Sequence, residues 1–130
     1  MSRTICVGKP SEDFEKAYEA VKTASVLGAK YVKAGVEAQS VDEEIRGIIQ
    51  YMGYGGNFRH AAGHGIGIDY IELPILGHKS KEVLATGNLV VVEPGVYVKG
   101  EYGIRIGDLY HIGENGTENL TRTTKELIIL

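Results

Sequence analysis

The hydrophobic pattern of the chain changes once, near Gly53, and this change limits the possible folds more than any other feature. Before it, apolar residues recur at helical spacing from Ser11 to about Val32 and again from Ser40 to Met52. After it, short apolar runs are separated by glycine. Helices followed by strands are typical of α+β domains. We therefore predict two helices packed on one side of a curved, mainly antiparallel sheet.

The ends of both helices can be predicted from local signals. Acidic residues directly after Ser11 favour a helix start, because negative charge suits the N-terminal turn. The second helix is expected to begin at Ser40, which forms a capping-box pattern with Glu43, and to end at Gly53. Its inward positions are expected to be Val41, Ile45, Ile48, Ile49 and Met52.

Residues 89–98 and 103–112 are two apolar segments joined by a short turn, and they predict a long β-hairpin. The first segment, LVVVEPGVYV, is almost wholly apolar, which predicts a strand buried on both faces. Near the start of the chain, TICV stops at Gly-Lys-Pro and is expected to be the end of a strand.

Length and composition exclude several classes of protein. With 130 residues, the chain is expected to form one domain, residues 1–130. The net charge of -3, with both signs interspersed, provides no basic stripe for nucleic acid. The sequence has no run of 18 apolar residues, so no membrane span is predicted. A single cysteine indicates a reducing compartment, so a cytoplasmic location is expected.

Glu93 is unusual because it lies in the middle of an apolar strand. Burying an ionised carboxylate costs several kcal/mol unless a cation compensates it. One explanation is an ion pair with Arg105 on the other arm of the hairpin. The other is a metal ion shared with His64. The pattern of residues leaves both open.

His60 and His64 have helical spacing, but the glycines at positions 63, 65 and 67 make a helix improbable there. The helical zinc-protease motif is therefore excluded. The same glycines do not form a phosphate loop, because no strand-then-helix context surrounds them.

Four motifs in order resemble the C-terminal part of the pita-bread metallopeptidases, in particular the Xaa-Pro dipeptidases and aminopeptidases. They are GHGIGIDYIELP (63–74), VVEPGVY (91–97), GIRIGD (103–108) and LTRTTKEL (120–127). The resemblance implies half of a pita-bread fold. It also implies hydrolysis of Xaa-Pro peptide bonds by a hydroxide on two divalent ions (Mn, Co or Zn), which two aspartates, one histidine and two glutamates hold.

Carried over by this resemblance, the metal histidine is His64 and the first metal glutamate is Glu93. His60 and Arg105 match positions that line the family's site. Glycine stands at position 107, where the resemblance implies the second glutamate.

The departures from the family pattern extend to other residues. Ile71 replaces the family's second histidine, and both aspartates would precede Met1. Asp108 is the nearest carboxylate to the missing glutamate, but neighbours on a strand face opposite sides, so we expect it to point away. Three of the five ligands are thus absent, and no bound cofactor is expected in the isolated chain.

Two functional hypotheses follow. The chain is either part of an Xaa-Pro peptidase, inactive by itself, or a non-catalytic module that binds peptides, including proline peptides, or proteins. Its expected partner is a second copy in a homodimer or a missing N-terminal half. Residues 89–112 are expected to present an apolar edge or face to that partner. Alternatively, Phe14, Tyr18 and the first helix cover this face and keep the chain monomeric.

Overall fold

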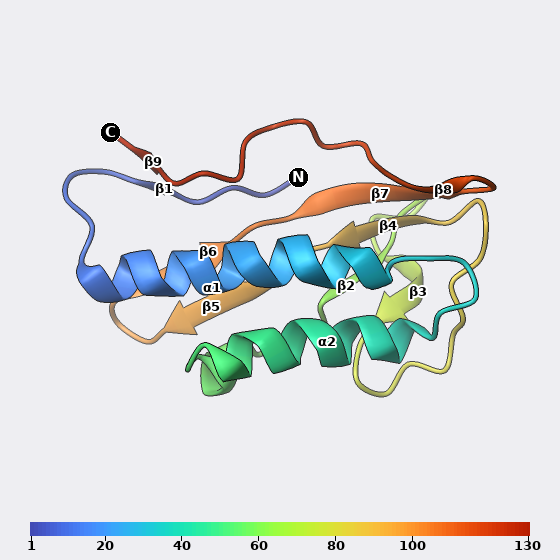
Figure 1. Cartoon of the computed structure of the whole chain (residues 1–130), viewed down its shortest axis with the longest axis horizontal. Helices are drawn as coiled ribbons and strands as arrows, with labels where there is room; N and C mark the ends of the chain where they lie inside the picture. Colours follow the sequence, from blue (N-terminus) through green and yellow to red (C-terminus); the bar gives the residue numbers. More distant parts are fainter.

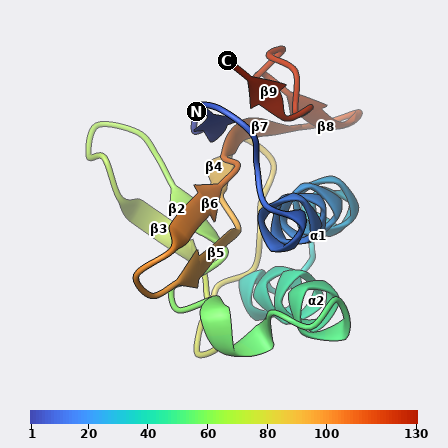
Figure 2. The ribbon, with the colours of Figure 1, turned by 90° about the vertical axis from the view of Figure 1, so that its left-hand side faces the viewer.

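The structure is a computed structural model that describes all 130 residues. It consists of two helices, two short 3-10 turns and nine strands, and both helices lie on the same side of the sheet (Figures 1 and 2). The helices are α1 (Glu12–Gly28) and α2 (Ala38–Tyr51), and the turns are η1 (Ala29–Tyr31) and η2 (Gly55–Asn57). The strands are β1 (Ile5–Cys6), β2 (Gly63–Gly65), β3 (Glu72–Leu76), β4 (Leu89–Val92), β5 (Gly95–Val98), β6 (Tyr102–Arg105), β7 (Asp108–Gly113), β8 (Gly116–Asn119) and β9 (Ile128–Ile129). The predicted α+β class is confirmed.

The main sheet has the strand order β3-β2-β4-β7-β8, and all of its pairs are antiparallel. The predicted long hairpin is present, but it is divided into the β4–β7 and β5–β6 ladders. The register is the same in both ladders, since Val92 pairs with Asp108 and Gly95 pairs with Arg105. Glu93 therefore lies across from Gly107, in the break between the ladders.

Helix α1 begins and ends close to the predicted positions. The Ser11 side chain caps it by accepting a hydrogen bond from the Phe14 amide at 3.2 Å. After Gly28 the chain continues as η1 to Tyr31. A Cβ added to Gly28 would lie 2.1 Å from Cγ1 of Ile45, so glycine is what allows α1 and α2 to approach so closely here.

The predicted start of the second helix is wrong. Helix α2 begins at Ala38, and Ser40 lies in its first turn without capping it. The physical reason is a distant contact: the Ala38 amide donates to the carbonyl of Glu82 at 2.9 Å. A loop carbonyl thus satisfies an amide at the helix start, so the helix begins before Ser40 without a side-chain cap. Gly53, with a φ of 94°, follows the end of the helix as predicted.

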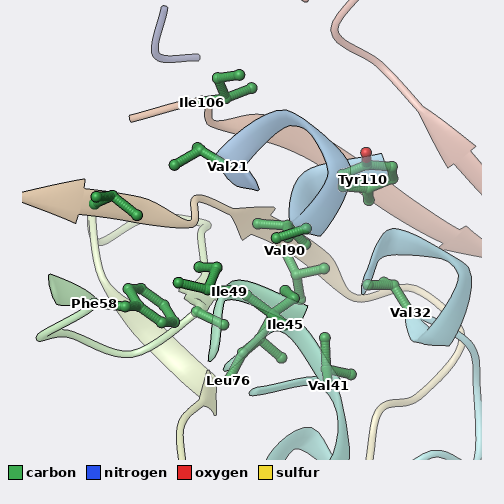
Figure 3. Packing of buried hydrophobic residues seen from close by; sticks show 14 of the residues in the cluster. Val21, Val32, Val41, Ile45, Ile49, Phe58, Leu76, Val90, Ile106 and Tyr110 are labelled. Atoms are coloured by element: carbon green, nitrogen blue, oxygen red, sulfur yellow. The ribbon is translucent and has the colours of Figure 1, made fainter. Parts of the chain in front are cut away.

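The core lies between the helices and the sheet (Figure 3). Val41, Ile45 and Ile49 of α2 are fully buried, whereas Ile48 and Met52 are only half-buried. Figure 3 shows Ile45 and Ile49 of α2 close to Val90 of β4, with Val21 of α1 above them.

The expected apolar face on residues 89–112 is not exposed. The inward side chains of these strands are buried, because α1 and α2 cover them. Tyr18 is 3% exposed, and Phe14 packs edge to face against Tyr102, as the alternative hypothesis expected. One group of exposed apolar side chains lies on the parallel β1–β9 pair and its flanks, which we call the terminal ribbon. Its members are Ile5, Val7, Ile128, Ile129 and Leu130.

No helix has the length and apolar character needed to cross a membrane.

Candidate metal centre

Glu93 and His64 face each other on the side of the sheet away from the helices. Val90 and Val92 belong to the core under the helices, so strand alternation turns Val91 and Glu93 to the opposite side. His64 pairs with Val91 across the β2–β4 ladder and therefore shares this side. Its Nε2 atom lies 3.7 Å from Oε1 of Glu93.

Glycines on both sides of His64 are required by the close approach of the neighbouring strands. A Cβ at Gly63 would lie 1.9 Å from the carbonyl oxygen of Val91, and one at Gly65 would lie 2.4 Å from that of Leu73. Because side chains cannot fit at these positions, the Gly-His-Gly sequence holds the imidazole between β3 and β4.

The tautomer of His64 follows from its hydrogen bond. Nδ1 lies 2.8 Å from the carbonyl oxygen of Gly65, which can only accept, so Nδ1 carries a hydrogen. In the neutral ring, Nε2 then presents a lone pair toward the Glu93 carboxylate. Two acceptors that face each other make no direct hydrogen bond, so this arrangement leaves room for a metal ion, a proton or a bridging water between them.

Arg105 approaches Glu93 from the other side. Its Nη1 atom lies 3.6 Å from Oε2 of Glu93, slightly beyond hydrogen-bond distance. The Glu93 side chain is 12% exposed and that of Arg105 is 39% exposed. Arg105 is therefore the charged neighbour of Glu93, and His64 is the neighbour that could share a metal ion with it, so the structure contains the geometry of both explanations.

His60 joins the same group through Tyr97. The Tyr97 hydroxyl accepts a hydrogen bond from Nε of Arg105 at 3.1 Å and lies 2.9 Å from Nε2 of His60. Burial, together with the charges of Arg105 and Arg46, lowers the pKa of His60, although the Ala61 carbonyl and Glu93 oppose this shift. The structure thus brings His60, His64, Glu93 and Arg105 into one cluster.

Tyr97 is a member of this cluster that sequence reasoning missed. The available signal was its place in the VVEPGVY motif, two residues along the strand from Gly95. A Cβ at Gly95 would meet the Tyr97 hydroxyl at 2.6 Å, so this glycine leaves room for the tyrosine side chain.

Gly107 lies beside Glu93, whereas the side chain of Asp108 points away from the cluster. A Cβ at Gly107 would lie 3.2 Å from Cβ of Glu93 and 3.2 Å from Oγ of Ser2. The next residue, Asp108, is fully buried in an ion-pair network with Arg3 and Lys125. Burial would raise the pKa of Asp108, but Lys125, Asn119 and Arg3 outweigh burial and hold that pKa below its usual value.

The comparisons with known proteins give the same family. The sequence matches the model of metallopeptidase family M24 over residues 1–114. The chain belongs to this family. It is 40% identical over its whole length to an uncharacterised peptidase of Bacillus subtilis and covers 37% of that protein. It is 38% identical over 128 residues to an Xaa-Pro dipeptidase of Pyrococcus horikoshii, of which it covers 36%.

Solved M24 structures share the fold. The Xaa-Pro dipeptidase from Bacillus anthracis superposes with a TM-score of 0.94 at 42% identity, over 98% of this chain and 36% of that one. The half pita-bread fold expected from the motifs is thereby confirmed. The chain spans about a third of the length of the relatives it matches.

Family M24 implies the use of divalent metal, and the donor set of this chain can be tested against that requirement. His64 and Glu93 supply two donors with suitable chemistry, and no group of three or more His, Cys, Asp or Glu side chains is present. A catalytic ion generally takes at least three protein ligands. His64 and Glu93 are thus the two donors that this chain brings together at the cluster.

A cavity of about 580 Å³ adjoins the cluster at His60. Its apolar walls include Phe58, Leu73 and Ile75, and Arg59 and Lys79 stand at its polar side. Neither of these two cations has a carboxylate partner within 4 Å. Its polar lining also includes His78, Ser80 and Glu82, so apolar surface lies beside charges of both signs.

Proposed function

We propose that this chain is a module of an Xaa-Pro peptidase-related protein, with a residual two-donor metal site formed by His64 and Glu93. We also propose that it hydrolyses no Xaa-Pro peptide by itself. The observation that supports both is the place of Gly107, which lies beside Glu93 where a carboxylate would add a third donor. A manganese, cobalt or zinc ion held by two side chains binds weakly and leaves its water poorly oriented.

Peptides containing proline are the ligands that the cavity beside His60 suits best. The apolar walls could receive a pyrrolidine ring, and Arg59 or Lys79 could pair with a terminal carboxylate. His60 and Arg105 would line the passage from this cavity to Glu93. A complete centre would need carboxylates from outside these 130 residues, from another segment or from a second copy. We place this module in the cytoplasm, because its single cysteine is free.

The test is a hydrolysis assay with Xaa-Pro dipeptides and added manganese, cobalt or zinc. We expect no release of proline above that of the metal alone. Turnover that is lost in the His64→Ala variant would show that the two-donor site is catalytic and would refute the proposal.

The second candidate function is a non-catalytic module that binds peptides or proteins. Gly107 and Ile71 favour it, because both lie inside the chain and no added segment would replace them. Ile71 is 56% exposed on the loop before β3, where it is free to contact a partner. Titration with a proline dipeptide, followed by NMR shifts of the residues around the cavity, would distinguish binding without turnover from no binding.

A further inference from the structure

We propose that Asp42 and Arg46 of α2 are positioning residues for the candidate site, because they hold the backbone from which His60 and Glu93 are placed. This inference rests on the proposed function only in assigning that site a role. The hydrogen bonds themselves are independent of it.

Asp42 is a fully buried carboxylate with three donors. Arg46 approaches it through two nitrogens, with Nε 2.9 Å from Oδ2 and Nη2 3.0 Å from Oδ1. The backbone amide of Ala62 donates to Oδ1 at 2.9 Å. A buried charge with this geometry is well compensated, and the third donor belongs to the segment that leads into β2.

Arg46 holds the same segment from its other side. Nη1 donates to the carbonyl of Phe58 at 3.0 Å, and Nη2 donates to the carbonyl of His60 at 2.8 Å. The guanidinium group lies 4.4 Å from the centre of the Phe58 ring, and that ring packs edge to face on the His60 imidazole at 5.0 Å.

Residues 58–62 form neither a helix nor a strand, so these contacts replace a regular hydrogen-bond ladder. The carbonyls of Phe58 and His60 and the amide of Ala62 all bond to the pair. On its other side, the Ala62 carbonyl accepts from the Glu93 amide at 2.7 Å. A single residue therefore separates the Asp42 carboxylate from the backbone of the candidate metal ligand Glu93.

A pair that only stabilised its own helix would not need these contacts. Glu12 and Lys16 of α1 have the same four-residue spacing, at 2.6 Å, and both side chains are largely exposed. That pair is a matched control, because it has the same spacing and charges and no contact with the site.

The experiment compares Arg46→Lys, Asp42→Asn and the control Glu12→Gln by NMR and amide hydrogen exchange. Lysine keeps the charge but cannot make the bidentate contact and both carbonyl bonds at once. We expect the exchange of the Ala62 and Glu93 amides to accelerate at least about tenfold in Arg46→Lys, as loss of charge-assisted hydrogen bonds implies. The amides of β7 should keep their protection.

A second readout is the imidazole of His60. Its pKa should rise toward its ordinary value when the loop is released into water, and its contacts with the Tyr97 ring should weaken. Glu12→Gln should change neither quantity. If Asp42→Asn does not fold, Arg46→Lys decides the question. The proposal would be overturned if all core amides lost protection equally. It would also be overturned if the His60 pKa and the exchange rate of the Ala62 amide did not change.

Discussion

Replacing Gly107 by glutamate is expected to turn the two-donor cluster into a metal site that can be measured by protein stability. The backbone at Gly107 has no positive φ, so a side chain causes no strain there. Its Cβ would lie 3.2 Å from both Glu93 and Ser2, a tight contact that a shift of a few tenths of an ångström relieves. The new carboxylate would then stand beside Glu93 and His64.

The expected magnitudes have opposite signs with and without metal. Two carboxylates about 4 Å apart repel by about 4 kcal/mol at an effective dielectric constant of about 20, and proton uptake and Arg105 offset much of this repulsion. We expect Gly107→Glu to lose about 1–3 kcal/mol of unfolding free energy in EDTA. Manganese at a hundred times its Kd would restore about 2.7 kcal/mol. For a domain of this size that corresponds to about 10 °C in Tm.

The assay is thermal unfolding by circular dichroism in EDTA and in increasing manganese. Gly47→Glu is the matched control, because it adds the same charge at an exposed helix position with no atom within 4 Å of the new Cβ. Gly107→Glu combined with His64→Ala tests whether the gain needs the cluster. The reasoning would be refuted if manganese raised the Tm of Gly107→Glu no more than that of Gly47→Glu.

Four further outcomes are expected. Gly28→Ala should lower the unfolding free energy in urea by about 1–3 kcal/mol, because overpacking against Ile45 outweighs the gain in helix propensity. The loss should be smaller in an Ile45→Ala background, and an equal loss in both backgrounds would contradict the contact. Because folding lowers the pKa of Asp108, its ionised carboxylate stabilises the folded state fully above the ordinary pKa of 3.8, and this stabilisation is lost as pH falls through the lower folded pKa. The unfolding free energy of Asp108→Asn should therefore fall less steeply at acid pH than that of the wild type. An unchanged pH dependence would argue against the network. Arg105→Ala should lower the unfolding free energy in urea by about 1–2 kcal/mol, because Arg105 is partly exposed and lies 3.6 Å from Glu93. A loss of about 3–5 kcal/mol, typical of a fully buried pair, would mean that the ion pair with Arg105 is the main compensation of the Glu93 charge. The exposed apolar side chains of the terminal ribbon should make the chain dimeric, because association would bury them. Light scattering should then give a mass of about 28 kDa, twice 14.1 kDa, and a monomer mass at micromolar concentration would exclude the dimer.

Features that depend on local patterns could be predicted from the sequence. Helical spacing and Ser11 located α1, and glycine ended α2. The apolar runs gave the long hairpin, and the motifs gave the family. These predictions succeeded because periodicity, caps and motifs are properties of neighbouring residues.

Features that depend on contacts between distant segments could not be predicted in this way. The start of α2 was mispredicted because the carbonyl that accepts from its first amide belongs to Glu82. The exposed apolar surface was misplaced because helix packing buried one set of strands and left the terminal ribbon open. The close pairing of α1 and α2 at Gly28, the place of Tyr97 and the contacts of Asp42 likewise arise from register and packing. Those are set by which segments meet in space, and the spacing of residues along the chain does not contain that information.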